Sequence, residues 1–522
     1  MKKTFSVQSV RAIEEPLLNA GRPLMRKAAY GLASECVKIL KEEYGGAYGK
    51  KVLGLVGSGN NGGDTLYALA FLAKRSVYAC AYIAHRSKIH TEAYEYAADA
   101  GVRFFFYNDD ARSVVDASYG STLIIDGLLG IGATGALRTP YDDILCEINN
   151  VRQYMDATYI AVDIPSGIDA DTGCLSTSSD GESLAFKADI TVTMGAYKPG
   201  LFTHAAREYV GRICLIDLDF PLENYVSEVS VIDQDECRDV LRIPEPLDHK
   251  YTRGVVGVIA GSSRYKGAGL LASHSALVSG VGMVRYLGGS DVGQILVEQT
   301  PEIVCESGRV QAWVIGSGIV ADDRKYIEKI ENIYEYALRE KLPLVVDAGG
   351  IDILTLWMRV KSDIHDYSHI VITPHAGELS RLFSNYGHHE WSRERIEANP
   401  MEAARFASDM LGAHVYLKGA VNYIASPAGH TYLVSQGPSW TGTAGAGDVL
   451  AGTMGALLAS SFERVNDISL IAAVAGYLHG KAALRASEAR IDEYGYTRGG
   501  HPITAHDIID NLPLAYGEII EN

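Results

Sequence analysis

The feature that most constrains the fold is an alternation of short β-branched apolar runs with longer helical stretches. This alternation predicts an α/β fold with a mostly parallel sheet, because parallel strands are joined by helical crossovers. Two blocks of strands are expected, the first at 51–57, 121–127, 158–164, 189–195 and 212–219, and the second at 255–261, 312–318, 342–350, 369–375 and 414–419. Two further β-rich runs flank SPAGH within 421–435 and predict a hairpin.

Between the two blocks, residues 235–254 contain two prolines, several charges and little periodicity. Such a stretch is typical of a linker. The chain of 522 residues is also too long for one domain of about 150 residues. We therefore expect two α/β domains, at 1–235 and 240–522.

The overall composition narrows the class of partner and the compartment. A net charge of −17 argues against nucleic acid or an anionic membrane as the main ligand. No apolar run approaches the roughly 20 residues of a membrane span, and the N-terminal residues contain no apolar signal segment. The seven cysteines form no CxxC pair and are expected to be reduced thiols. We expect a cytoplasmic protein, and a homo-oligomer because many α/β enzymes of this kind are oligomeric.

A glycine-rich turn at 57–64 (GSGNNGGD) follows the first expected strand and precedes a helix. Glycines permit positive φ and a close approach of the backbone to a ligand, and the amides of a helix start bind anions. Asn60 and Asn61 tolerate left-handed geometry or can turn a carbonyl toward a cation. The turn is neither a Walker A motif nor GxGxxG, and a plain structural turn is the alternative.

Polar residues end two further strands of the first block. Asp126 is followed by a second glycine-rich loop at 127–140, and Asp163 is followed closely by Ser166. In open α/β sheets the ligand crevice lies at the carboxyl ends of the strands. Asn61, Asp126 and Ser166 are hard oxygen donors without histidine or cysteine, which favours an alkali or alkaline-earth cation. Each alone would be read as a turn or cap residue, and the combination favours a site.

These motifs, NNGGD, the strand-terminal Asp with its glycine loop, and VDIPSG, resemble the epimerase domain of the bifunctional NAD(P)H-hydrate repair enzymes. The segments PLMRKAAYGLA at 23–33 and TMGAYKPG at 193–200 fit the same family, and the resemblance covers roughly residues 1–225. One departure is Thr65, where the family usually has glycine. Because threonine at an early helix position can act as a cap, we expect binding to be retained.

The resemblance implies a Rossmann-like three-layer domain that acts on hydrated NADH or NADPH, which exists as R and S epimers. It implies potassium ligands at Asn61, Asp126 and Ser166. We expect Asp163 to be the group that shuttles a proton. The implied substrate contacts are Asn60, Asn61, Gly62, Gly63, Asp64, Gly130, Ile131, Gly132, Ala133, Thr134, Gly135, Ala136 and Asp163.

The strongest motif of the second block is TGTAGAGDVLAG at 441–452. Its small residues let the amides of a helix start converge on a phosphate and stabilise the charge of a transferring phosphoryl group. Asp448 lies in the first turn, where it can deprotonate an attacking hydroxyl. An N-cap with an acidic first turn is the alternative. The motif resembles the ribokinase-like superfamily, in which this Asp is the catalytic base.

Further segments narrow this resemblance, namely TPHAGE at 373–378, KGAVN at 418–422, the small-residue loop and helix at 261–284, and IGSGI at 315–319. Together they resemble the dehydratase domain of the same repair enzymes, over roughly 240–515. The resemblance implies hydrated-nicotinamide contacts at Ala268, Gly318, His375 and Asp448. It implies adenine-nucleotide contacts at Lys418, Gly419, Ala420, Val421, Asn422 and Gly447.

The implied second reaction is dehydration of the S epimer with ADP or ATP as the phosphoryl donor. Mg²⁺ is expected with the nucleotide, but no ligand set is assigned to it. His388, His389 and Glu390 lack a spaced partner and are not expected to bind metal. The alternative functions are a ribokinase-like small-molecule kinase with a non-catalytic N-terminal binding domain, and a first domain that serves only as a scaffold.

Overall fold

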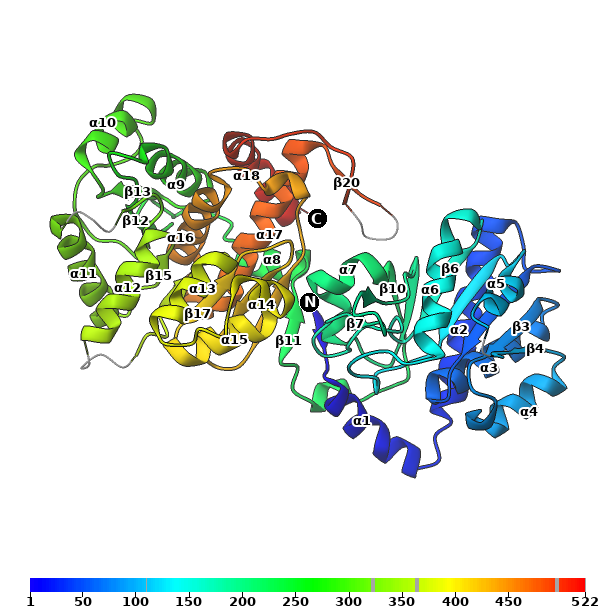
Figure 1. Cartoon of the computed structure of the whole chain (residues 1–522). Coiled ribbons are helices and arrows are strands. Elements are labelled where there is room, and N and C mark those ends of the chain that lie inside the picture. The colour runs from blue at the N-terminus through cyan, green and yellow to red at the C-terminus, as the bar shows by residue number, and fades with distance from the viewer. Residues whose placement is uncertain (109, 321–323, 362–365, 493–496, 522) are drawn as a thin grey trace. The chain divides into compact units, whose positions relative to one another are not determined.

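The computed structural model describes residues 1–108, 110–320, 324–361, 366–492 and 497–521, which form two compact units (Figure 1). The first unit consists mainly of residues 3–227 and the second mainly of residues 228–491 and 497–521. The division falls between Ser227 and Glu228, ahead of the stretch 235–254. The start of that stretch is helical, in α8 (Gln234–Val240), because Cys237 and Val240 form a buried stripe one turn apart.

The first unit contains a parallel seven-stranded sheet in the order β10-β9-β6-β5-β2-β3-β4. The chain runs outward from β2 in one direction and then returns to β5 on its other side, so the sheet has a topological switch point between β2 and β5. The strands are β2 (Lys51–Val56), β3 (Tyr78–Ile83), β4 (Arg103–Phe106), β5 (Leu123–Gly127), β6 (Thr158–Val162), β9 (Ile190–Met194) and β10 (Arg212–Ile216).

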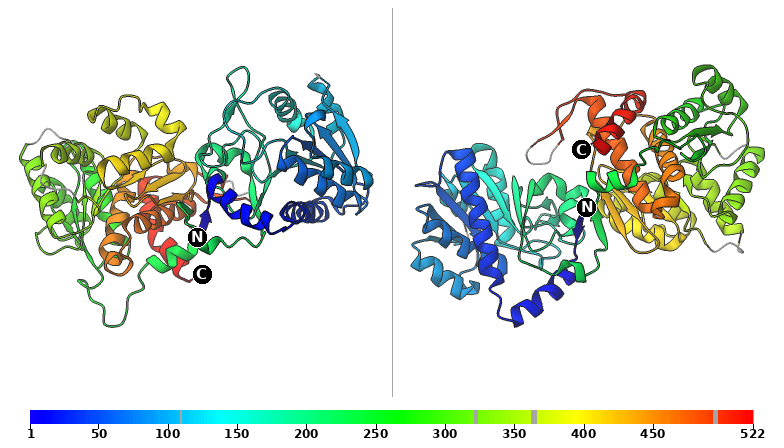
Figure 2. Two further views of the ribbon diagram at one scale, coloured as in Figure 1. Left: turned by 90° about the horizontal axis from the view of Figure 1, so that it is seen from below. Right: turned by 180° about the vertical axis from the view of Figure 1, so that it is seen from behind.

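Helices cover both faces of this sheet (Figures 1 and 2). Alternate residues of the strands face opposite layers. In β2, Val52 and Val56 join the core under the first layer of helices, whereas Leu53 and Leu55 join the core under the second. The first layer holds α1 (Val7–Asn19), α2 (Leu24–Tyr44), α3 (Asn60–Ala73) and α4 (Thr91–Asp99), and the second holds α5 (Arg112–Ser118) and α6 (Tyr141–Val151). Smaller elements are α7 (His204–Val210), β7 (Ser176–Thr177) and β8 (Ser183–Leu184).

The sheet of the second unit has the order β1-β11-β19-β18-β17-β16-β15-β14-β12-β13. Neighbouring strands from β13 to β17 are parallel, and β17, β18 and β19 pair antiparallel. The strands are β1 (Lys2–Thr4), β11 (Val229–Val231), β12 (Val255–Ile259), β13 (Met283–Tyr286), β14 (Ala312–Ile315), β15 (Leu344–Val346), β16 (Ile370–Ile372), β17 (His414–Leu417), β18 (Asn422–Ala425) and β19 (Thr431–Val434).

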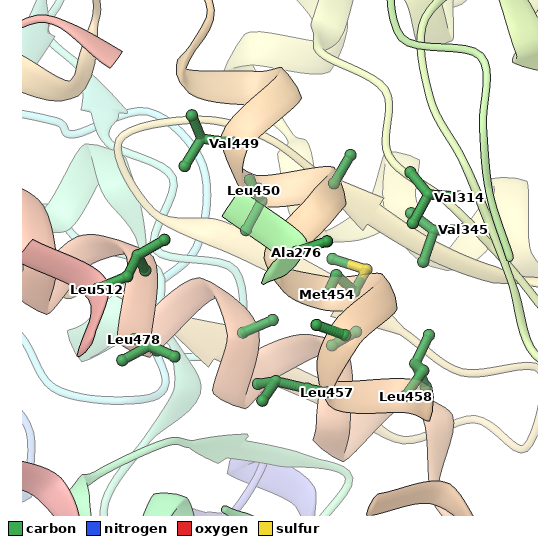
Figure 3. Close-up of a cluster of buried hydrophobic side chains, with 14 of the residues drawn as sticks. Ala276, Val314, Val345, Val449, Leu450, Met454, Leu457, Leu458, Leu478 and Leu512 are labelled. Carbon is green, nitrogen blue, oxygen red and sulfur yellow. The ribbon is translucent and has the colours of Figure 1, made fainter. Parts of the chain in front are cut away.

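One face of the second sheet packs against the main core of this unit, where α16 lies on the strands (Figure 3). Met454 and Leu458 of α16 share this core with Val314 of β14 and Val345 of β15. The helices of this layer are α8, α9 (Lys266–Val278), α16 (Ala446–Val465), α17 (Ile468–Ser487) and α18 (Ala505–Glu521). The remaining elements are α10 (Ser290–Gln299), α11 (Arg324–Arg339), α12 (Gly349–Val360), α13 (Ala376–Asn385), α14 (Arg393–Ala398), α15 (Pro400–Leu411), β20 (Arg490–Ile491) and β21 (Thr497–Arg498). Of these helices, α12 contacts β15, and α15 contacts β17 and β18.

The predicted α/β class is confirmed, and all ten expected parallel-block strands and the hairpin occur. The sequence analysis missed β3, β4 and β13, whose sequences YACAYI, RFFF and MVRY contain few β-branched residues. Among the described residues, no helix combines the length and the apolar character that a membrane span requires.

Candidate functional site

The first candidate site lies at the carboxyl ends of β2, β5 and β6, beside the switch point of the sheet. Asn61, in the first turn of α3, donates from Nδ2 to the carbonyls of Leu129 at 3.0 Å and Val162 at 2.7 Å. The amide nitrogen is therefore fixed by the two neighbouring strand ends, and the side-chain oxygen Oδ1 points away from these two carbonyls.

Asp126 and Ser166 meet beside Asn61 through a buried hydrogen-bond network. Oδ2 of Asp126 accepts from the backbone amide of Ser166 at 2.7 Å, and Oδ1 accepts from the Ser166 hydroxyl at 2.7 Å. The Ser166 hydroxyl in turn accepts from the amide of Leu129 at 2.9 Å. The structure thus brings together the three oxygen donors that the sequence singled out.

This donor set fits a hard cation. Asp126 has no exposed surface, and burial raises the pKa of its carboxyl to about 6, although hydrogen bonds from Ser166 and Leu128 oppose the shift. Within the described residues, no ion pair involves Asp126. A carboxylate that is buried without an ion-pair partner is stabilised by a nearby positive charge. Ligands that are all oxygen atoms suit an alkali ion.

The glycines of the first turn serve close backbone approach rather than positive φ. A Cβ on Gly57 would lie 1.8 Å from the Leu128 carbonyl oxygen, and one on Gly62 would lie 2.2 Å from the Gly57 oxygen. Of the two alternatives for Asn60 and Asn61, the left-handed geometry does not occur, because both residues lie in the first turn of α3. Gly63 and Asp64 continue the same helix.

Thr65 does not cap this helix, contrary to expectation. It is fully buried, and its hydroxyl donates back to the Asn61 carbonyl at 2.7 Å, four residues earlier. Its side chain fits only because Gly54 and Gly127 lie opposite, where a Cβ would approach it to 2.6 and 1.9 Å. The departure from the family pattern is therefore accommodated by packing.

Asp163 is held in a strained backbone conformation with φ of 66°, which is uncommon for a residue other than glycine and is often found at functional sites. Its Oδ1 accepts from the Thr193 hydroxyl at 3.1 Å, from the Met194 amide at 3.0 Å and from Nζ of Lys198. Lys198 is only 1% exposed. The sequence analysis missed this lysine, although it lies inside the segment TMGAYKPG and is the only charged residue there.

The glycine loop after β5 lies at the rim of the first site. A Cβ on Gly130 would come 2.5 Å from Oδ1 of Asn61, and one on Gly132 would lie 3.1 Å from the guanidinium of Arg11. Gly135 has a φ of 81°. The residues of this loop from 130 to 136 are partly or fully exposed, namely Gly130, Ile131, Gly132, Ala133, Thr134, Gly135 and Ala136.

The second candidate site centres on the start of α16. Gly445 precedes the helix with a φ of 90°, and a Cβ there would lie 2.5 Å from the Leu271 side chain, so glycine is required on both grounds. The first-turn amides of a helix have no partner within the helix and attract anions. The buried His479 of α17 lies close to the backbone of Ala446, and burial lowers the pKa of its ring to about 4.

Asp448 lies in the first turn of α16, half-buried among charged groups. Burial raises the pKa of its carboxyl to about 6, and the negative charges of Asp347 and Glu378 raise it further. The charge of Lys418 and the neighbouring hydroxyl of Ser317 act in the opposite direction. A carboxyl group with such a pKa is well suited to accept a proton near neutral pH.

Lys418 forms an ion pair with a buried carboxylate, Asp347. Its Nζ donates to Oδ1 of Asp347 at 2.9 Å and lies 3.9 Å from Oε2 of Glu378. Asp347 also accepts from the hydroxyls of Ser317 at 2.9 Å and Thr373 at 2.8 Å. The sequence analysis missed Asp347 as a site residue, although its place at the end of the expected strand 342–350 was a signal.

Other expected residues line the same strand ends. Gly318, with φ of 66°, packs on Ala268, since a Cβ on Gly318 would lie 2.5 Å from that of Ala268. His375 caps α13 in a capping box with Glu378, and its side chain is 60% exposed. The backbones of His375 and Lys418 form an isolated parallel β-bridge.

The turn from Lys418 to Asn422 lies beside the start of α16. A Cβ on Gly447 would lie 3.5 Å from Nζ of Lys418. Within the turn, Gly419 donates its amide to Oδ1 of Asn422 at 3.1 Å, Ala420 is exposed and the Val421 side chain is buried in the core. Any ligand contact of Val421 is therefore made by its backbone. In the described part of the chain, no group of three or more His, Cys, Asp or Glu residues is arranged to hold a metal ion.

The two units together define a two-domain α/β enzyme. The second unit combines a glycine-rich helix start with a buried carboxylate, as phosphoryl-transfer sites require. Family models match both parts, one described as NAD(P)H-hydrate dehydratase over residues 256–498 and one as YjeF-related protein N-terminus over residues 21–200.

The chain is 37% identical over 468 residues to the bifunctional NAD(P)H-hydrate repair enzyme Nnr of Mycobacterium tuberculosis strain H37Rv, covering 88% of this chain and 90% of the relative. The enzyme of the same name from Synechocystis sp. is 28% identical over 519 residues, covering 94% and 91%. A solved ADP/ATP-dependent NAD(P)H-hydrate dehydratase from Bacillus subtilis, co-crystallized with ATP and Mg²⁺, has 24% identity and a TM-score of 0.45, covering 56% of this chain and 100% of that one. The chain therefore belongs to the family of bifunctional NAD(P)H-hydrate repair enzymes, and the resemblance read from its motifs is confirmed.

Proposed function

We propose that this chain repairs hydrated NADH and NADPH in two reactions. The first domain, residues 1–235, interconverts the R and S epimers. The second domain, residues 240–522, dehydrates the S epimer with ADP or ATP and releases phosphate. Family membership supports both reactions, and the observation that carries the second is the half-buried Asp448 carboxyl, with its raised pKa, at the glycine-rich start of α16.

In the second reaction the ring hydroxyl is a poor leaving group until it is phosphorylated. Asp448 accepts the hydroxyl proton as the oxygen attacks the terminal phosphorus of the nucleotide. The amides of Gly445 and Gly447 stabilise the transferring phosphoryl group, while the Ala446 amide donates to the Thr443 carbonyl at 3.3 Å and holds the turn. The ring nitrogen lone pair then expels phosphate, and a proton leaves the neighbouring ring carbon to restore the dihydronicotinamide.

The ion pair of Lys418 with Asp347 lies close enough to Asp448 for both charges to act on its carboxyl group. Because Lys418 also lowers the pKa of Asp448, it favours the base form of that residue. We propose that Ala268, Gly318, His375 and Asp448 contact the hydrated nicotinamide. The proposed adenine-nucleotide contacts are Lys418, Gly419, Ala420, Val421, Asn422 and Gly447, with Mg²⁺ bound to the nucleotide phosphates.

In the first reaction we propose that Asp163 moves the proton. Asn61, Asp126 and Ser166 hold a potassium ion, which supplies positive charge that offsets Asp126 and attracts the anionic substrate. The substrate contacts are the residues of the helix start, 60–64, the glycine loop, 130–136, and Asp163. We further propose that the protein is cytoplasmic and forms a homo-oligomer.

Two variants test the separation of the two sites. Purified protein is mixed with separated R or S epimers of NADH hydrate and with ADP or ATP, and the absorbance of restored dihydronicotinamide is followed. Asp448→Asn should abolish nucleotide-dependent recovery from the S epimer. Asp163→Asn should leave S-epimer recovery intact and slow consumption of the R epimer. Loss of both activities in Asp163→Asn would contradict the two-site assignment.

A further inference from the structure

Asp64 is a buried carboxyl group with an unpartnered oxygen, one turn of α3 after Asn61, whose amide binds the Val162 carbonyl next to the proposed proton-transfer residue Asp163. The residue is 8% exposed, and its Oδ1 has no hydrogen-bond partner among the described residues. A buried polar atom without a partner is costly, and such atoms are often found where a ligand supplies the missing bond. The first-domain chemistry described above gives Asp64 only a substrate contact.

Asp163 presents the opposite arrangement. Its donors in the described part of the chain, Nζ of Lys198, the Thr193 hydroxyl and the Met194 amide, all bind Oδ1. Nζ of Lys198 also donates to the Thr193 hydroxyl at 3.1 Å and to the Met194 carbonyl at 2.9 Å, so it has no hydrogen left for substrate. Lys198 is therefore a positioning residue that holds Asp163 in an ion pair and leaves its Oδ2 for the reaction.

The environments of the two carboxyl groups therefore differ. The pKa of Asp64 is raised well above its ordinary value, first by burial and then by the negative charges of Asp163 and Glu14, against the opposing charge of Lys198. Asp163 forms an ion pair with Lys198, whereas Asp64 forms none with the residues that the structure describes. Two titratable groups whose environments separate them in this way are typical of acid and base partners in catalysis.

We propose that Asp64 is a second catalytic residue of the first site and acts as the general acid to the base Asp163. The proposal rests on the proposed epimerase function and assigns a step to each carboxyl group. In this proposal the substrate hydroxyl is the hydrogen-bond partner of Oδ1 of Asp64. The buried Lys198, whose three hydrogens are all used in hydrogen bonds, then serves to hold Asp163 in place.

The step balances in atoms and electrons. The Asp64 carboxyl gives its proton to the ring hydroxyl, the carbon–oxygen bond breaks and water leaves, while the ring nitrogen lone pair forms a double bond to the same carbon. Water then adds to the opposite face of that carbon, the double-bond electrons return to nitrogen, and Asp163 accepts the proton that the water loses. The product is the other epimer, and the reverse reaction exchanges the roles of the two residues.

Other charged groups face this pair and set the pH at which it works. Glu14 of α1 lies near both, and the pKa of its carboxyl is raised by burial and by Asp163 and lowered by Lys198 and Arg11. His90, which caps α4, lies beside Gly63. Glu14 is the rival candidate for the acid, and it is less buried than Asp64.

The test measures the rate of conversion of the R epimer by the full-length protein between about pH 5 and pH 9, with S-epimer repair as an internal control. The wild-type rate should fall on both the acidic and the basic side. Asp64→Asn should reduce the rate by about 10²-fold or more and remove the basic limb, since an amide cannot give up a proton. Asp64→Glu, which keeps an acid, should retain a basic limb at a changed position. Glu14→Gln should shift that limb and keep most of the rate.

Several results would overturn the proposal. These are a wild-type rate without a basic limb, an Asp64→Asn variant within threefold of wild type, or a loss in Glu14→Gln as large as in Asp64→Asn. The wild-type profile gives this answer even if a variant fails to fold. If the wild type does not interconvert the epimers at all, the proposed function fails instead, and this outcome is seen before any variant is made.

Discussion

The half-buried carboxylate of Asp448 should lower the stability of the second unit at neutral pH, and a variant without this charge should be more stable. Burial, reinforced by Asp347 and Glu378, raises the pKa of Asp448 from 3.8 to about 6. Because the folded-state pKa lies above the unfolded one, the folded state loses stability as the pH rises from about 4 to above 6. A shift of this size corresponds to about 3 kcal/mol at neutral pH, as an upper limit.

Asp448→Asn removes this titration and keeps the shape of the side chain. The variant should therefore be more stable than wild type by up to about 3 kcal/mol at pH 7.5, and the difference should shrink toward zero near pH 4. Thermal and urea unfolding of the second unit at several pH values, without nucleotide, would measure it. The same variant should be inactive on the S epimer.

A matched control is Asp507→Asn. Asp507 accepts from the amide and hydroxyl of Thr504 at 2.7 Å, and these bonds hold its pKa below the ordinary value. This control should give no gain in stability at pH 7.5. A variant Asp448→Asn that is equally or less stable than wild type at pH 7.5, or whose gain does not depend on pH, would refute the reasoning.

Three further predictions concern the two sites. Potassium should raise the Tm of the first unit above its value in lithium, because a bound cation stabilises the buried Asp126 carboxylate, whose pKa burial raises to about 6. Asp126→Asn should lose this difference. An equal ion effect in both proteins would contradict the cation site. Gly57→Ala should destabilise the first unit by roughly 3 kcal/mol or more, since its Cβ would lie 1.8 Å from a carbonyl oxygen, whereas Gly59→Ala, whose Cβ meets nothing within 4 Å, should be nearly neutral in urea unfolding. The S-epimer repair rate should rise about tenfold from pH 5 to pH 7, with a midpoint near 6. Ser317→Ala should move that midpoint upward, because the Ser317 hydroxyl lowers the pKa of Asp448. A flat wild-type profile would exclude Asp448 as the base.

Most strands of the two sheets, and the position of both candidate sites at the carboxyl ends of these strands, could be predicted from the sequence. Buried parallel strands appear as continuous β-branched runs, and polar residues at their carboxyl ends meet at one edge of the sheet. This reasoning alone placed Asn61, Asp126 and Ser166 near one another, which the hydrogen bonds between Asp126 and Ser166 and from Asn61 to the strand ends bear out.

The ionic partners of the site residues could not be predicted in the same way. Lys198 lies 35 residues after Asp163, and Lys418 lies 71 residues after Asp347. Sequence periodicity reports which face of an element is buried, but not which charged group of a distant loop reaches it. Thr65 illustrates the same limit, because its fit depends on Gly54 and Gly127 of two separate strands.

The most direct test of the central claim is the stoichiometry of repair of the S epimer by the wild-type protein. The purified enzyme is mixed with the S epimer of NADH hydrate and ADP or ATP, and restored NADH and released inorganic phosphate are measured in the same sample. The account predicts one phosphate for each NADH restored, with no phosphorylated nicotinamide accumulating. Consumption of nucleotide with a stable phosphorylated product and no NADH would contradict it and would indicate a small-molecule kinase instead.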